Sequence, residues 1–196
     1  RKKNNYCSEH GHTVKKFRID NLLTYEPITK NQEIAYEQWD EGDHLVLCGS
    51  AGTGKTFIGM YLALETILDK QYEQDKLVIV RSVVPTREMG YLPGSIEEKV
   101  DAYTAPYRAI ANELFNEKMA YEMLETQGTI SFMSTSFIRG QTIDDAVILV
   151  DEMQNLTFHE LDSIITRVGR NTRIIFSGDY YQSDLSKETD KNGVLH

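Results

Sequence analysis

Cysteine is nearly absent from this chain of 196 residues, which contains only Cys7 and Cys48. Cys48 falls in an apolar run that predicts a buried strand, so we expect no disulfide and a reducing, cytoplasmic setting. Long apolar runs are absent too: none approaches the roughly 20 residues that a membrane-spanning helix needs. The first residues do not resemble a secretory signal. The sequence therefore predicts a protein without a membrane segment.

Basic residues are outnumbered, because 21 lysines and arginines stand against 30 aspartates and glutamates, for a net charge of −9. Proteins that coat nucleic acid without sequence preference usually have a basic surface, since neutralisation of phosphates dominates their affinity. This chain lacks that excess. Any binding of nucleic acid must therefore use a local basic strip.

The first 20 residues are polar and basic, and Cys7, His10 and His12 lie close together there. A structural zinc site needs about four ligands, with a second pair at suitable spacing, and no second pair of cysteines exists. We therefore expect residues 1–20 to be an N-terminal extension rather than a metal site. Because the chain opens with Arg1 instead of methionine, we also expect it to be a trimmed or partial form.

Apolar runs typical of strands alternate with helical periods along the rest of the chain. We expect strands at 44–48, 76–81, 129–133, 146–150 and 173–177, helices at 31–39, 55–70, 107–125 and 157–168, and a loop at 82–96. Such alternation predicts a parallel sheet covered by helices on both faces. No repeat or internal boundary is visible. The sequence predicts a single α/β domain over residues 21–196.

One glycine-rich segment, GSAGTGKT at residues 49–56, lies between an expected strand and an expected helix. It fits the Walker A pattern G-x-x-x-x-G-K-[ST], whose backbone N–H groups and helix N-terminus bind phosphate. We expect Lys55 to reach the β- and γ-phosphates and Thr56 to coordinate Mg²⁺. The segment therefore predicts a bound purine nucleoside triphosphate, ATP with magnesium.

Two carboxylates, Asp151 and Glu152, follow the apolar strand before them and complete this site. Ligands of parallel sheets bind at this carboxyl edge, so we expect Asp151 to hold Mg²⁺ through water and Glu152 to act as general base on the attacking water. An acidic pair that only caps the next helix is the alternative. Gln182 is expected to sense the terminal phosphate, and Gln32 to select adenine. The expected nucleotide-binding residues are Gln32, Gly49, Ser50, Ala51, Gly52, Thr53, Gly54, Lys55 and Thr56.

In these residues the chain resembles the PhoH family of P-loop ATPases, which is related to the superfamily 1 helicases. The resemblance covers roughly residues 27–186. It rests on Asn31 and Gln32, the glycine-rich segment, and residues 91–100, 137–140, 150–155, 166–169 and 177–185. It implies a RecA-like P-loop NTPase fold. The short length and the Tyr/Lys/Asn-rich tail look like the phage-encoded members.

The resemblance also implies an activity. Family members are described as ATP-binding phosphate-starvation proteins, some of them fused to a nuclease and credited with RNA unwinding. No cluster of nuclease-type carboxylates appears outside the expected ATP site here, so nuclease activity is not carried over. Related helicases bind ATP between two cores, and this chain holds one. We therefore expect a homo-oligomer, such as a hexameric ring, with an arginine finger supplied by Arg167 or Arg139, or thirdly Arg87.

Contacts with single-stranded RNA or DNA are expected at residues 82–96 and 137–140, as in a helicase. The side chains expected to supply charge and stacking platforms are Arg81, Arg87, Tyr91, Phe137 and Arg139. Two other functions stay open. One is a nucleotide-dependent switch or assembly module that acts on protein partners, and the other is a small-molecule kinase, which would need an arginine-rich lid and an acceptor pocket.

Overall fold

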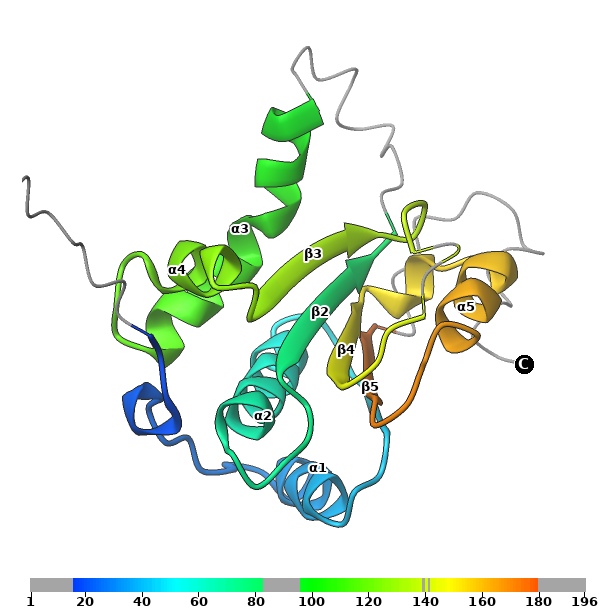
Figure 1. Cartoon of the computed structure of the whole chain (residues 1–196). Coiled ribbons are helices and arrows are strands. Elements are labelled where there is room, and N and C mark those ends of the chain that lie inside the picture. Colours follow the sequence, from blue (N-terminus) through cyan, green and yellow to red (C-terminus); the bar gives the residue numbers. More distant parts are fainter. Residues whose placement is uncertain (1–15, 83–95, 139, 141, 180–196) are drawn as a thin grey trace, which may run out of the picture.

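Five parallel strands form one sheet in the order β1-β5-β4-β2-β3 (Figure 1). This computed structural model describes residues 16–82, 96–138, 140 and 142–179. The strands are β1 (Leu45–Cys48), β2 (Lys76–Arg81), β3 (Ile130–Ser134), β4 (Ala146–Asp151) and β5 (Arg173–Gly178). The predicted parallel α/β sheet is confirmed, and each strand lies within about one residue of its predicted bounds.

Helices cover both faces of this sheet, as predicted. They are α1 (Lys30–Asp40), α2 (Lys55–Leu68), α3 (Ile96–Leu114), α4 (Ala120–Thr126) and α5 (Phe158–Ile165), with short 3₁₀ helices η1 (Ile19–Asn21) and η2 (Met153–Asn155). Helices α1 to α4 share one hydrophobic cluster with the sheet, and α5 and η2 pack in a second cluster on the opposite face. No helix within the described residues is both long and apolar enough to span a bilayer.

The single helix predicted over residues 107–125 is wrong, because α3 begins earlier and a turn separates it from α4. Asn116 takes a φ of 48° in that turn, a left-handed conformation that asparagine tolerates and that ends a helix. The amide of Asn112 donates to the Lys118 carbonyl at 2.8 Å and accepts the Tyr121 N–H at 3.3 Å. Local side-chain hydrogen bonds therefore redirect the chain here.

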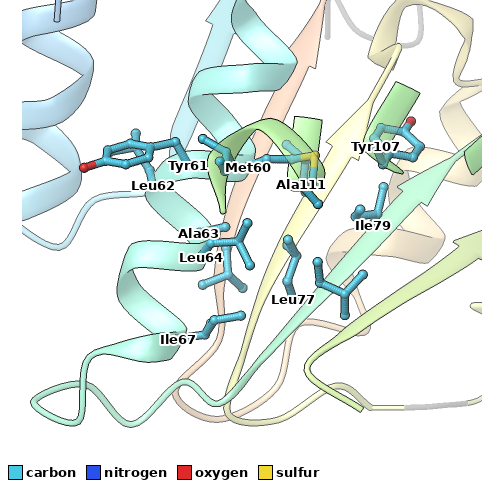
Figure 2. Packing of buried hydrophobic residues seen from close by; sticks show 14 of the residues in the cluster. Met60, Tyr61, Leu62, Ala63, Leu64, Ile67, Leu77, Ile79, Tyr107 and Ala111 are labelled. Atoms are coloured by element: carbon cyan, nitrogen blue, oxygen red, sulfur yellow. The ribbon is translucent and has the colours of Figure 1, made fainter. Parts of the chain in front are cut away.

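Strand β4 shows how the sheet separates the two clusters. Its side chains alternate: Val147 and Leu149 join the cluster of α2 to α4, whereas Ile148 and Val150 join the cluster of α5, as the two-residue period of a strand requires. Figure 2 shows side chains of α2, β2 and α3 gathered in the first cluster. All six β4 residues are buried, so the strand that carries Asp151 at its end is held between the two clusters.

The burial of Phe17 and of Cys48 differs from what the sequence indicated. Phe17 is 3% exposed and its ring centroid lies 4.6 Å from that of Phe115, so this part of the expected extension is packed in the core. Cys48 is exposed, and the prediction that it is buried is wrong. Strand β1 ends the described sheet and pairs only with β5 there, which also leaves Val46 63% exposed.

Glu160 joins α5 to the carboxyl ends of two strands. Its carboxylate accepts the Thr157 N–H at 2.9 Å, completing a capping box, and it also accepts the hydroxyls of Ser82, at 2.9 Å, and Thr135. Burial by itself would raise the pKa of Glu160, but the hydrogen bonds from Thr135, Thr157 and Ser82 outweigh it and lower this pKa. The ionised carboxylate therefore stabilises the fold.

Arg173, the first residue of β5, connects the amino-terminal end of the sheet to α1. Its guanidinium carbon lies 3.3 Å from the centre of the Trp39 ring, a cation–π contact. The same group donates to the carbonyls of Trp39 and of Asp43, the latter at 2.9 Å. Trp39 is 2% exposed, so this contact lies at the boundary of the core.

Candidate P-loop nucleotide site

The glycine-rich loop runs from the end of β1 to the start of α2. Gly52 and Gly54 have φ values of 77° and 78°, which favour glycine because a side chain is strained there. Gly54 directly precedes α2, so the unpaired N–H groups of the first helical turn lie at the loop. The Lys55 amine donates to the Ser50 carbonyl at 2.7 Å, and the Thr53 hydroxyl donates to the same oxygen at 2.9 Å.

Asp151 is held by hydroxyl groups from two helices. Thr56 of α2 donates to Oδ1 at 2.9 Å, and Tyr107 of α3 donates to Oδ2 at 3.0 Å. Burial and the nearby Asp151 raise the pKa of Tyr107 well above its ordinary value, so the phenol stays protonated and remains a donor. Asp151 is 5% exposed. These contacts fix the orientation of its carboxylate.

Arg81 lies beside these carboxylates, at the end of β2, where it is the register partner of Asp151. Burial by itself would lower the pKa of Arg81, but Tyr107, Glu152 and Asp151 together raise it. Its guanidinium carbon also lies 5.7 Å from the centre of the Tyr103 ring. The arginine predicted to contact nucleic acid therefore supplies positive charge to the nucleotide site.

Glu152 has a φ of 53° and a ψ of 43°, a left-handed conformation that is uncommon for a residue with a side chain. Such backbone strain clusters at functional sites. The amide of Gln154, in η2, donates to the Glu152 carboxylate through Nε2. The chain therefore turns sharply at Glu152, directly after β4, and a residue of η2 holds the Glu152 carboxylate.

Asp179 connects the end of β5 to the glycine-rich loop. Its carboxylate accepts the Ala51 N–H at 3.0 Å, and its own N–H donates to Oε1 of Gln154 at 2.9 Å. No role for Tyr107, Gln154 or Asp179 was predicted. Asp179 lies in the segment after β5 and Gln154 in the acidic segment after β4, and both segments belong to the residues on which the family resemblance rests. Tyr107 lies 44 residues before Asp151, and no motif in the sequence marks it.

Two cavities meet at the loop. The larger, about 650 Å³, lies between α1 and β1 and brings together Gln32, Cys48 and Lys55. The smaller, about 290 Å³, is lined by Ala51, Gly52, Gly54, Lys55, Thr56, Phe57, Ile110, Asp151, Glu152, Ser177, Gly178 and Asp179. Oε1 of Gln32 accepts the Ile28 N–H at 2.8 Å, which fixes its amide in the larger cavity.

Two of the remaining predicted residues, Arg167 and Phe137, are described by the structure and line neither cavity. The Arg167 carbonyl accepts the Ile143 N–H at 2.8 Å, which places this residue at the amino edge of β4 and β5, away from the loop. Its Nε is buried without a hydrogen-bond partner among the described residues. Phe137, in the loop after β3, is 74% exposed. Arg87, Tyr91, Arg139 and Gln182 lie outside the described residues.

A parallel RecA-like sheet, a glycine-rich loop between β1 and α2, and Asp151 in contact with Thr56 together define a P-loop nucleotide-binding protein. The sequence profile of one family, described as "PhoH-like protein", matches residues 24–196. The chain belongs to this PhoH family.

Individual relatives agree with this assignment. Protein PhoH2 of Bacillus subtilis is 39% identical over 144 residues, which are 71% of this chain and 32% of that protein. Protein PhoH of Escherichia coli is 34% identical over 172 residues, or 86% and 48%. The PhoH-like protein of Mycobacterium leprae is 31% identical over 163 residues, or 83% and 46%. The chain thus spans less than half the length of each.

Among solved structures, a chain from "Structural Basis for DNA Unwinding at Forked dsDNA by two coordinating Pif1 helicases" is similar with a TM-score of 0.41 and 14% identity. The similarity covers 87% of this chain and 38% of that chain. It carries no weight for function.

Proposed function

We propose that this chain hydrolyses ATP with Mg²⁺ at the smaller cavity. The observation that carries the proposal is the 2.9 Å hydrogen bond between the Thr56 hydroxyl and Oδ1 of Asp151. It joins the phosphate-binding loop to the acidic end of β4, and Lys55 and Glu152 line the same cavity. Phosphate binding, metal binding and a general base therefore meet within one volume of about 290 Å³.

The loop supplies the phosphate contacts. Backbone N–H groups at the start of α2 face the cavity, and the Lys55 amine exchanges its hydrogen bond with the Ser50 carbonyl for phosphate oxygens. Thr56 and Asp151 fit Mg²⁺, which prefers oxygen ligands and keeps several waters. When bound, the ion neutralises charge on the β- and γ-phosphates. No group of three or more His, Cys, Asp or Glu side chains suited to a metal occurs among the described residues.

Glu152 is the general base in this proposal. Its carboxylate lines the cavity beside Asp151, and a base within hydrogen-bond reach of the attacking water contributes about 10²–10⁴-fold to the rate. Gln32 selects adenine from the larger cavity, where its amide offers both a donor and an acceptor, and Gln182 senses the terminal phosphate.

Coupling to single-stranded RNA or DNA is a further part of the proposal. The exposed ring of Phe137, at the carboxyl edge of the sheet, supports it as a stacking surface. We also propose a homo-oligomer, such as a hexameric ring, in which Arg167 or Arg139 of one subunit completes the site of the next.

ATP turnover of the wild type, Lys55→Ala and Glu152→Gln tests the hydrolysis. We expect Lys55→Ala to lose binding and turnover, and Glu152→Gln to bind ATP while turning over about 10²–10⁴-fold more slowly. Lys70→Ala and Glu73→Gln, which change exposed residues far from the cavities, are the matched controls. Wild-type turnover in the Glu152→Gln variant would exclude the assigned base.

The same assay with single-stranded RNA and DNA tests the coupling. An ATPase rate that rises when single-stranded RNA or DNA is added, and rises less at high salt, supports the helicase-like function. A rate that responds only to a protein partner supports the switch or assembly module instead. For the arginine finger, full turnover of both Arg167→Ala and Arg139→Ala in the assembled oligomer would rule out these two residues.

A further inference from the structure

A continuous path of hydrogen bonds connects the phosphate-binding loop to Glu152. The Ala51 N–H donates to the Asp179 carboxylate at 3.0 Å, and the Asp179 N–H donates to Gln154 at 2.9 Å. Gln154 in turn donates through Nε2 to the Glu152 carboxylate. Both Asp179 and Gln154 are nearly buried, at 6% and 8% exposed, so the path runs through the interior next to the smaller cavity.

The first hydrogen bond in this path uses the Ala51 N–H, a donor that a bound phosphate would also use. Ala51 and Asp179 line the smaller cavity together with Lys55 and Thr56, and loop N–H groups at such a site bind anions. The Asp179 carboxylate is itself an anion on one of these N–H groups. A terminal phosphate that approaches Ala51 therefore competes with Asp179 for that hydrogen bond and repels its charge.

The contact between Asp179 and Gln154 leaves no room for Asp179 to move without moving Gln154. A side chain on Gly178 would approach Met153 Cγ to 2.5 Å and Gln154 Oε1 to 2.6 Å, both far closer than van der Waals contact. The end of β5 therefore touches η2 without a gap. Because packed elements transmit movement, a shift of Asp179 moves Gln154.

We infer that Asp179 and Gln154 are positioning residues, which couple a terminal phosphate at the loop to the orientation of Glu152. This inference rests on the proposed function. A diphosphate lacks the group that competes for Ala51, so it leaves the hydrogen-bonded path in place. A triphosphate displaces Asp179, and the amide of Gln154 then carries Glu152 toward the attacking water. Through this coupling, Glu152 takes its catalytic orientation only when a triphosphate is bound.

Gln154→Met, which keeps the shape of the side chain and removes its hydrogen bonds to Asp179 and Glu152, tests the second half of this path. We expect kcat to fall about 10–100-fold, within the range of a misplaced general base, with the KM for ATP and the Kd for ADP unchanged within about twofold. Gln154→Glu, which keeps the acceptor but repels Glu152, gives the same loss if Gln154→Met does not fold. Gln74→Met is the matched control, since the Gln74 amide likewise donates a hydrogen bond, to the Asn171 carbonyl at 2.8 Å, but lines neither cavity. A wild-type kcat, or a loss of kcat and nucleotide affinity together, overturns the assignment.

Asp179→Asn tests the first half, because it removes the charge while it keeps the size of the side chain. Calorimetric titration with ADP and with the non-hydrolysable β,γ-imido analogue of ATP gives the ratio of the two Kd values. We expect the analogue to bind at least about tenfold more tightly than it binds to the wild type, because one like-charge contact is lost, and ADP to bind as in the wild type. An unchanged ratio overturns the coupling.

The double variant Asp179→Asn, Gln154→Met tests whether the two residues act along one path. Asp179→Asn should also lower kcat, because an uncharged side chain is displaced less by the terminal phosphate. Residues that act as a unit are non-additive, so the kcat of the double variant should equal that of Gln154→Met, whereas a fall equal to the product of the two single losses refutes the path. A wild type that binds both nucleotides without hydrolysing ATP overturns the proposed function alone, and the ratio of Kd values still decides the coupling. Binding of neither nucleotide overturns both.

Discussion

The hydroxyl of Tyr107 offers a sharp test of how the nucleotide site is held together. Tyr107→Phe removes the 3.0 Å hydrogen bond to Oδ2 of Asp151 and leaves the buried ring, which packs 6.0 Å from the ring of Phe132, in place. A buried hydrogen bond to a charged group contributes about 1.5–3 kcal/mol. For a domain of this size, a loss of about 2 kcal/mol in the free energy of unfolding lowers the Tm by roughly 4–8 °C.

Tyr121→Phe is the matched control for this experiment. Tyr121 is equally buried, at 0% exposed, but its hydroxyl has no hydrogen-bond partner among the described residues. Removal of an unsatisfied buried hydroxyl is neutral or stabilising, so the Tm should stay or rise. Calorimetry or thermal unfolding followed by circular dichroism measures both variants. Equal Tm values for the two would refute the role given to the Tyr107 contact.

Tyr107→Phe should also weaken the binding of Mg²⁺. Residues that orient a metal ligand change metal affinity by about 10–100-fold when they are lost, so the Mg²⁺ concentration that half-saturates ATP binding should rise within that range in Tyr107→Phe. Tyr121→Phe should not change it. A normal Mg²⁺ requirement together with a lowered Tm would mean that Tyr107 stabilises the fold without orienting Asp151.

Other contacts give further predictions. Because hydrogen bonds lower the folded pKa of Glu160 below the ordinary value of about 4.3, its stabilisation is complete above that pH and disappears as pH falls through the folded pKa. Glu160→Gln should therefore lower the Tm at pH 7, and the difference from the wild type should disappear as the pH falls through the folded pKa of Glu160; a constant difference would contradict this. Arg173→Lys, which loses the planar contact with Trp39, should cost about 1 kcal/mol in urea unfolding followed by tryptophan fluorescence, and no change would show that the contact contributes nothing.

The strands and the place of the glycine-rich loop between β1 and α2 could be predicted because short-range patterns decide them. Residues 77–80 are apolar and three of them are aliphatic residues branched at Cβ, and they form the centre of β2; Thr29 precedes α1 as its capping residue. The placement of Thr56 against Asp151 follows from the geometry of any parallel sheet with a phosphate loop. Local propensity and the overall topology agree at these positions.

The rest depends on packing between segments far apart in the sequence. Tyr107 reaches Asp151 only because α3 crosses the end of β4, and no period in the sequence records that crossing. Cys48 is exposed because its strand ends the described sheet, whereas an apolar run reads the same at an edge and in the centre. Arg81 could be recognised as a functional arginine but not assigned to a site, since its partners come from β4 and α3.

The exposed position of Cys48 gives the nucleotide site a chemical reporter. Its thiol lies in the cavity shared with Gln32 and Lys55, at the end of the strand that leads into the loop. In a Cys7→Ser background, the rate at which a maleimide labels this thiol measures access to the cavity. The proposed binding of ATP along α1 and β1 predicts slower labelling, so nucleotide occupancy can be followed in a variant that does not hydrolyse ATP.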